Sequence, residues 1–139
     1  MPEPATRQEA RILRGYKTVA VVGISADEEK ASYRVARYLQ EHGYRIIPVN
    51  PREKEVLGER CYPDLCSVPG HVEVVDVFRR PRFVPRIVAE AMYAGAKVVW
   101  MQEGIVHEAA ARRAREAGME VVMDRCMMKE HKRMTGGEA

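Results

Sequence analysis

The segment 18-TVAVVGISADEEKASYRVARYLQEHGYRIIPVN-50 decides the fold of this 139-residue chain. It begins with an uncharged, valine-rich run at 18–22, which indicates a buried strand. Gly23 then starts a turn, and a helix is predicted from about Ser32 to His42. A second apolar run at 45–49 predicts another strand. Together these elements form a βαβ unit, in which the two strands are parallel.

The turn after the first strand has a chemical consequence. It places backbone N–H groups at the carboxyl end of the sheet, beside the N-terminus of the predicted helix. Such an arrangement is typical of sites that bind a phosphate group. The segment therefore predicts a nucleotide or a nucleotide-like ligand.

The rest of the chain repeats the alternation of strands and helices. The further predicted elements are strands at 72–78, 97–101 and 121–123, a short edge strand at 59–62, and helices at 5–14, 84–94 and 107–117. Asp64 is expected to cap a brief helical turn. The polar segment after the last strand is assigned to no element, and a disordered tail is expected from about residue 135. The alternation predicts an α/β fold: a Rossmann-like, doubly wound parallel sheet of five to six strands with helices on both faces.

Length and composition indicate one domain that spans residues 1–139. The apolar runs are far shorter than the roughly 20 residues that cross a bilayer, so no membrane partner is expected. The N-terminus lacks an apolar signal segment, and the three cysteines are an odd count, so reduced thiols in a cytoplasm are expected. A net charge of +3 is too small to indicate nucleic-acid binding. It suits an anionic small ligand, but also an ordinary protein surface.

The glycine pattern narrows the choice of nucleotide. A dinucleotide fingerprint has G-x-G-x-x-G after the first strand and an acidic residue about 20 positions later. Here the turn contains Gly23 alone, and the second strand ends in Asn50-Pro51-Arg52 with no acid, which disfavours NAD. Arg52, with Lys54 close behind, would suit a ribose phosphate. NADP carries one at the 2′ position, and coenzyme A carries one at the 3′ position.

The residues that follow each predicted strand of the parallel sheet are mostly polar or glycine. Because the carboxyl ends of parallel strands meet at one edge, these residues are expected to line a ligand crevice there. They are Gly23, Ser25, Asn50, Pro51, Arg52, Phe78, Arg79, Arg80, Gln102, Glu103, Gly104, Asp124, Arg125 and Cys126.

The chain resembles CoA-binding proteins related to the N-terminal domain of the succinyl-CoA synthetase alpha subunit. The resemblance covers roughly residues 12–134 and rests on segments that occur in the same order at matching spacing. They are VAVVGIS at 19–25, KASY at 30–33, HGYRIIPVNP at 42–51, VDVFRR at 75–80, VVWMQEGI at 98–105 and DRCMMKEH at 124–131.

This resemblance implies a Rossmann-like domain that holds coenzyme A along the carboxyl edge of the sheet. It places Arg52 or Lys54 near the adenosine 3′-phosphate, and it places Phe78 and Arg79 beside the adenine or the pantetheine arm. The cofactor-binding residues predicted in this way are Gly23, Ile24, Ser25, Ala26, Lys30, Asn50, Pro51, Arg52, Lys54, Phe78, Arg79, Met101, Gln102, Glu103 and Gly104. The phosphorylated histidine of the synthetase lies in a second domain outside the resemblance, so synthetase activity is not implied.

The turn departs from the synthetase pattern, because Asp27 and Glu28 stand where the synthetase has further glycines. Either Phe78 or Ile24 would offer an apolar surface to adenine. Cys126 lies near the proposed crevice, where it would face the pantetheine thiol or simply be a small buried thiol.

No histidine stands beside a serine or cysteine in a nucleophile motif. His107 is expected to cap a helix or to lie on the surface. Asp76 is expected to make a hydrogen bond at a strand end, and the alternative is an acid with a perturbed pKa. Cys61 and Cys66 would need two further ligands to hold a metal, so no metal site is predicted. We therefore expect a stand-alone CoA-binding module without catalytic residues. The alternative is an NADP-dependent reductase or an acyl-CoA-using enzyme whose active residues are not identified.

Two further stretches bear on partners. Residues 79–86 are basic and contain Phe83, but one aromatic residue and two prolines make a poor nucleic-acid strip. The methionines at 123, 127, 128 and 134 are typical of core filling or of a dimer surface, so a homo-oligomer is compatible with the sequence.

Overall fold

A five-stranded parallel sheet forms the centre of the computed structural model, which describes residues 7–136. Its strands are β1 (Thr18–Val22), β2 (Arg45–Val49), β5 (Val74–Val77), β6 (Val98–Met101) and β7 (Glu120–Val122). The strand order is β2-β1-β5-β6-β7, and every pairing is parallel. The connection after β1 leads to β2 on one side of β1, and the strands from β5 onward lie on its other side, so the strand order reverses between β1 and β5. A crevice is expected at such a switch point, outside the carboxyl ends of the strands.

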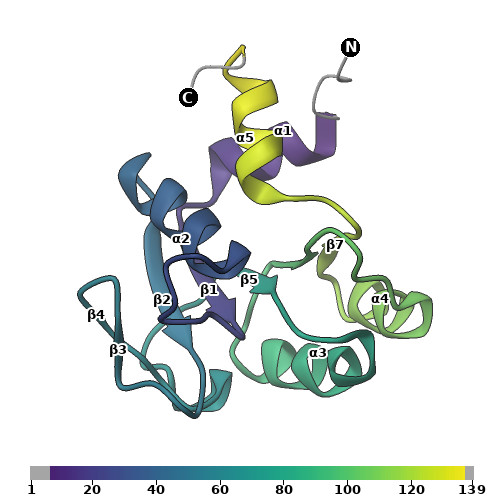
Figure 1. Ribbon diagram of the computed structural model, residues 1–139. Coiled ribbons are helices and arrows are strands. Elements are labelled where there is room, and N and C mark those ends of the chain that lie inside the picture. The colour runs from purple at the N-terminus through teal and green to yellow at the C-terminus, as the bar shows by residue number, and fades with distance from the viewer. Residues whose placement is uncertain (1–6, 137–139) are drawn as a thin grey trace.

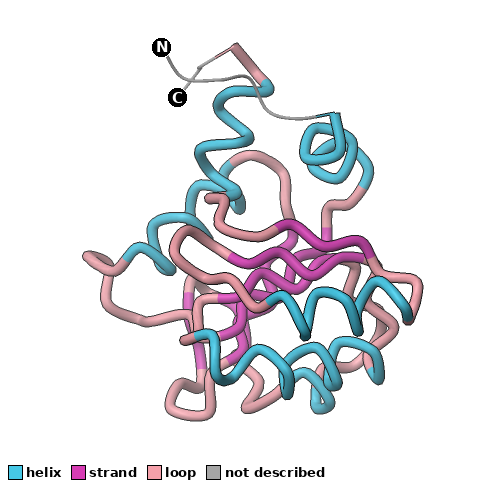
Figure 2. Tube along the Cα trace, turned by 90° about the vertical axis from the view of Figure 1, so that its right-hand side faces the viewer, coloured by secondary structure: helices cyan, strands magenta, loops and turns pink. Residues whose placement is uncertain are grey.

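Helices cover both faces of the sheet, as predicted (Figures 1 and 2). The helices are α1 (Arg7–Gly15), α2 (Ala31–Glu41), α3 (Val84–Tyr93), α4 (Glu108–Glu116) and α5 (Met127–Met134). Val75 and Val77 of β5 belong to the core cluster beneath α3 and α4, whereas Val74 belongs to the cluster beneath α1, α2 and α5. This alternation follows from the pleat of a strand, which sends successive side chains to opposite faces. Within residues 7–136, no helix has the length and apolar character that crossing a membrane requires.

The minor elements lie between β2 and β5 and just before α3. The strands β3 (Glu55–Val56) and β4 (Glu59–Arg60) form a separate antiparallel hairpin. The predicted edge strand at 59–62 therefore joins the main sheet only through an isolated parallel bridge between Tyr62 and Val49. The short turns are η1 (Leu65–Ser67) and η2 (Pro81–Phe83). Asp64 caps η1 as predicted, because its Oδ1 accepts hydrogen bonds from the Ser67 amide and hydroxyl, each at 2.8 Å.

The helix α5 was not predicted, because the segment after β7 was interpreted as a polar tail. Its buried residues are Met127, Glu130 and His131, and two of these three are polar. Glu130 is only 1% exposed and forms an ion pair with Arg133, and the His131 Nδ1 lies 2.7 Å from the Tyr38 hydroxyl. A polar composition therefore hid a buried helix face. Residues 135–136 form a turn, and the rest of the predicted disordered tail lies outside the described residues.

The buried face of α5 yields a stability prediction. Met127 is fully buried in the cluster that α5 shares with α1 and α2. Met127→Ala is therefore expected to lower the free energy of unfolding by about 2–5 kcal/mol, since it leaves a cavity in the core. Met92→Ala, at a methionine that is 39% exposed, is the matched control and should change this free energy by about 0.5 kcal/mol or less. If urea unfolding shows that Met127→Ala and Met92→Ala lower the free energy of unfolding equally, Met127 is not packed in the core.

Candidate functional site

Gly23, directly after β1, is where the turns after β1 and β5 meet. Its φ angle is 90°, a conformation that residues with a Cβ rarely adopt. A Cβ added here would lie 2.5 Å from the Phe78 carbonyl oxygen and 2.8 Å from the Cδ of Arg79. The Gly23 amide also donates a 2.9 Å hydrogen bond to the Val49 carbonyl, which ties the turn to the end of β2. Glycine is required here by backbone conformation and by close approach together.

The rest of the turn is held by its own polar side chains. The Ser32 hydroxyl accepts from the Ser25 amide, the Ser25 hydroxyl accepts from the Asp27 amide, and the Asp27 carboxylate accepts from the Glu29 amide. Lys30 occupies the N-cap position of α2 without a side-chain cap, and the first turn of α2 contains no acidic residue. The positive end of the helix is therefore left available to an anion.

Asn50 fixes the neighbouring turn after β2. Its side-chain amide donates to the Ile24 carbonyl at 2.7 Å, and its Oδ1 accepts from the Arg52 amide at 2.8 Å. Its backbone amide donates to the Tyr62 carbonyl at 2.8 Å. The side chain predicted to bind cofactor is thus occupied in joining the two turns that border the crevice.

A groove of about 770 Å³ runs between these turns and the segment after β5. We call it the cationic groove, and it is lined by Gly23, Lys30, Asn50, Pro51, Arg52, Phe78, Arg79, Arg80, Arg82 and Phe83. Five of the lining side chains are cationic and none is acidic. Among residues 7–136, no carboxylate lies within the 4.0 Å ion-pair distance of any of the five. Such a groove attracts a ligand with several negative charges.

Two of these arginines are positioned by an aromatic ring. The guanidinium carbons of Arg79 and Arg82 lie 4.1 Å and 4.8 Å from the centre of the Phe83 ring. Stacking on a ring restricts a long side chain before a ligand arrives, so less conformational entropy is lost on binding.

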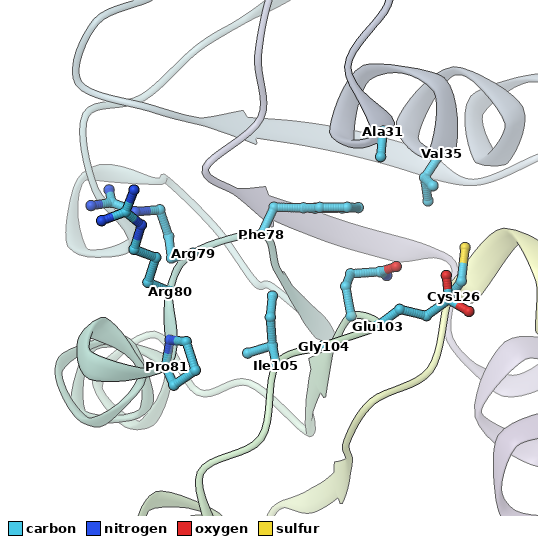
Figure 3. A pocket seen from close by; sticks show the side chains of 11 residues that line it. Ala31, Val35, Phe78, Arg79, Arg80, Pro81, Glu103, Gly104, Ile105 and Cys126 are labelled. Carbon is cyan, nitrogen blue, oxygen red and sulfur yellow. The ribbon is translucent and has the colours of Figure 1, made fainter.

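A second cavity of about 420 Å³ adjoins the groove (Figure 3). We call it the apolar cavity, and it is lined by Ala31, Val35, Phe78, Arg79, Arg80, Pro81, Gln102, Glu103, Gly104, Ile105 and Cys126. Phe78, Arg79 and Arg80 line both spaces, so the two are continuous. In Figure 3 the guanidinium groups of Arg79 and Arg80 point away from the part of the cavity where Val35 and Cys126 lie.

Gln102 and Asp76 form a buried polar pair behind the apolar cavity. Gln102 is 3% exposed, and its amide nitrogen donates to Oδ1 of Asp76, which is fully buried. The other carboxyl oxygen, Oδ2, has no hydrogen-bond partner among the described residues. Burial raises the pKa of Asp76 to about 7, although the hydrogen bond from Gln102 opposes this rise. Asp76 therefore titrates near neutral pH inside the core.

Most of the predicted site residues meet at this edge, but some do not. Gly23, Lys30, Asn50, Pro51, Arg52, Phe78 and Arg79 line the cationic groove, and Gln102, Glu103 and Gly104 line the apolar cavity. Ser25 and Ala26 belong to the turn beside the groove.

The three remaining predicted residues line neither of the two spaces. The Ile24 side chain is fully buried in the core, so the prediction that it offers a surface to adenine is wrong. Met101 is likewise fully buried, and its side chain does not line either space. Lys54 is exposed but does not line the groove.

Sequence reasoning missed part of the lining. Arg82 and Phe83 line the groove, and Ala31, Val35 and Ile105 line the apolar cavity. The dense basic run at 79–82 could have indicated Arg82 and Phe83 as groove residues, but it was interpreted only as a poor nucleic-acid strip. Ala31, Val35 and Ile105 have no polar side-chain group, so nothing in the sequence distinguishes them from core residues.

Two further titratable groups near the site are His107, which has a structural role, and Cys126, which lines the apolar cavity. The His107 Nδ1 accepts a 3.0 Å hydrogen bond from the Ala110 amide, which confirms the predicted cap of α4. Burial raises the pKa of the Cys126 thiol. Within residues 7–136, no group of three or more His, Cys, Asp or Glu side chains is arranged to hold a metal ion.

Comparison with known proteins identifies a family. The CoA binding domain family matches residues 17–132. The protein YneT of Bacillus subtilis, which is uncharacterized, is 37% identical over 131 residues, which are 94% of this chain and 97% of YneT. A solved structure of a hypothetical protein from Pyrococcus horikoshii has a TM-score of 0.91 and 43% identity, and the match covers 98% of this chain and 99% of that one.

Part of a larger enzyme is also similar. The alpha subunit of the ADP-forming acetate–CoA ligase II of Pyrococcus furiosus is 35% identical over 82 residues. The match covers 58% of this chain but only 18% of that subunit.

Proposed function

Since the chain belongs to the CoA binding domain family, as the resemblance predicted, we propose that it binds coenzyme A at the carboxyl edge of the sheet without catalysing a reaction. The cationic groove is the observation that carries this proposal. It presents Lys30, Arg52, Arg79, Arg80 and Arg82 to one space, with no acidic side chain in the lining. Coenzyme A has a pyrophosphate and a ribose 3′-phosphate, and arginine forks match phosphate oxygens in charge and in geometry.

The pyrophosphate and the 3′-phosphate of coenzyme A have separate positions in this proposal. The pyrophosphate lies beside the Gly23 turn at the uncapped N-terminus of α2, where the first backbone N–H groups of the helix and its dipole favour an anion. The 3′-phosphate lies near Arg52. The sequence left Arg52 and Lys54 as alternatives, and only Arg52 lines the groove. Phe78, which lines both spaces, flanks the pantetheine arm.

The lining of the two spaces supports binding without catalysis. It includes no histidine, and its one cysteine, Cys126, has a pKa that burial raises, which disfavours the reactive thiolate. Neither space therefore presents an activated nucleophile with its base. The ligase subunit that is similar to this chain is much longer, and we do not propose its activity for this chain.

Thermal unfolding with excess ligand tests the proposal. A ligand at about 100 times its dissociation constant adds roughly 2.7 kcal/mol of stability. For a domain of this size that free energy should raise the melting temperature by about 5–15 °C. Coenzyme A should cause this shift, dephospho-CoA a smaller one, and NAD none. A shift with NADPH alone would replace the proposal with a reductase.

Arg80→Ala tests the groove itself. Arg80 is exposed, lines the groove and makes no ion pair among the described residues, so its removal should leave folding intact. Loss of one hydrogen bond to a charged group is worth about 1.5–3 kcal/mol, so affinity for coenzyme A should fall about 10- to 100-fold in titration calorimetry. Arg112→Ala, on the exposed surface of α4, is the control and should leave affinity unchanged. Equal affinities of the two variants would remove Arg80 from the site.

A further inference from the structure

The apolar cavity has a size and lining that the phosphates of coenzyme A do not explain. Ala31, Val35, Phe78, Pro81 and Ile105 provide its apolar walls. Its volume of about 420 Å³ lies at the lower end of the range for small-molecule pockets. It opens from the cationic groove at Phe78, so a ligand whose phosphates occupy the groove can extend into it.

The chemistry of coenzyme A indicates which part would enter. Its phosphates lie toward one end, and its pantetheine arm ends in a thiol that carries acyl groups as thioesters. With the phosphates in the groove, the arm passes Phe78, whose ring points toward Cys126 in Figure 3. The thioester end then lies among Val35, Ile105 and Cys126, with the Glu103 carboxylate beside Cys126 (Figure 3).

The polar members of the lining select against a charged acyl group. Arg79 and Arg80 direct their guanidinium groups away from this end of the cavity (Figure 3). Glu103 is exposed at the rim and pairs with Lys129, with both carboxylate oxygens 3.0 Å from the Lys129 Nζ. Gln102 is uncharged, and the Asp76 carboxyl behind it has an oxygen without a partner among the described residues. An acyl carboxylate at this end would therefore meet the Glu103 carboxylate, with which Lys129 is already paired, and would approach a buried acid.

We propose that the apolar cavity receives the acyl group of a short, uncharged acyl-CoA, so that the protein binds such a thioester more tightly than free coenzyme A. This inference rests on the proposed function, because it needs the phosphates in the cationic groove. The cavity limits the length of the acyl chain, and its inner end, away from the guanidinium groups of Arg79 and Arg80, disfavours dicarboxylic acyl groups.

Titration calorimetry with butyryl-CoA, succinyl-CoA, coenzyme A and adenosine 3′-phosphate 5′-diphosphate tests the inference. The last compound has the phosphates but no pantetheine arm, so it reports on the groove alone. Each fully buried methylene is worth about a fourfold gain in affinity, so butyryl-CoA should bind at least about tenfold more tightly than coenzyme A. Succinyl-CoA should bind no more tightly than coenzyme A.

Ile105→Trp should fill the cavity and abolish the preference for butyryl-CoA while the affinity for adenosine 3′-phosphate 5′-diphosphate stays within about twofold. Val106→Trp is the matched control, because Val106 is 42% exposed and does not line the cavity. Ala31→Leu narrows the cavity from its opposite wall and replaces Ile105→Trp if that variant does not fold.

The outcomes distinguish a failure of this inference from a failure of the proposed function. Equal affinities of wild-type protein for butyryl-CoA and coenzyme A would overturn the inference and leave coenzyme A binding in place. Tighter binding of succinyl-CoA than of butyryl-CoA would also overturn it. Absence of binding by coenzyme A and by adenosine 3′-phosphate 5′-diphosphate would overturn the proposed function and the inference with it.

Discussion

Gly23→Ala is expected to lower the free energy of unfolding by about 2–6 kcal/mol, through backbone strain and a steric clash together. The φ angle of 90° is unfavourable for alanine, and the new Cβ would lie 2.5 Å from the Phe78 carbonyl oxygen. Because that oxygen belongs to the backbone after β5, relief would require the turns after β1 and β5 to separate. The same movement would widen the cationic groove and weaken the binding of coenzyme A.

Gly43→Ala is the matched control for this prediction. Gly43 has a φ angle of 91°, and no atom outside its chain neighbours lies within 4 Å of an added Cβ. It therefore carries the backbone cost without the clash, about 1–2 kcal/mol. Urea unfolding of both variants measures the difference. If the two substitutions cost the same, the turns after β1 and β5 do not approach each other as closely as described.

Asp76→Asn is expected to change how stability depends on pH. The pKa of Asp76 is raised from 3.8 to about 7 by burial, so the folded protein keeps a proton that the unfolded chain releases. Stability therefore falls as the pH rises from about 4 to about 7, by as much as about 4 kcal/mol from this group. Asparagine has no proton to lose, so the variant should lack this decline. The stability of the variant relative to the wild-type protein should therefore increase from pH 5 to pH 8, and at pH 8 the variant should be the more stable.

Urea unfolding at pH 5, 6, 7 and 8 measures this difference. Asp124→Asn removes a carboxylate from an exposed position after β7 and controls for the general loss of a negative charge. The plot of its free energy of unfolding against pH should run parallel to that of the wild-type protein. Parallel curves for Asp76→Asn as well would show that Asp76 is ionised in the folded protein at pH 5, contrary to the environment described for it.

The sheet could be predicted from local patterns. The apolar runs at 18–22 and 45–49 coincide with β1 and β2, and the predicted bounds of the other three strands of this sheet lie within two residues of those observed. Parallel strands buried on both faces have continuous apolar sequences, which are easy to recognise. The helix α5 was missed for the opposite reason. Glu130 and His131 are buried through an ion pair and a hydrogen bond, and their partners are visible only in the folded chain.

The site was predicted less completely than the fold because position after a strand does not fix the direction of a side chain. Ile24 follows Gly23 directly, yet its side chain turns into the core. Lys54 lies next to the β3–β4 hairpin, and its side chain does not line the groove. Arg82 and Phe83 join the groove because the short turn η2 brings them back beside Arg79. That return depends on tertiary packing rather than on local sequence.

A crystal structure of the protein with coenzyme A tests the central claim most directly. We expect the pyrophosphate beside the Gly23 turn and the N-terminus of α2, with Arg80 in contact with phosphate oxygens. We expect the 3′-phosphate near Arg52 and the pantetheine arm passing Phe78. Coenzyme A bound at another surface, with the cationic groove occupied by solvent alone, would contradict binding at this edge of the sheet.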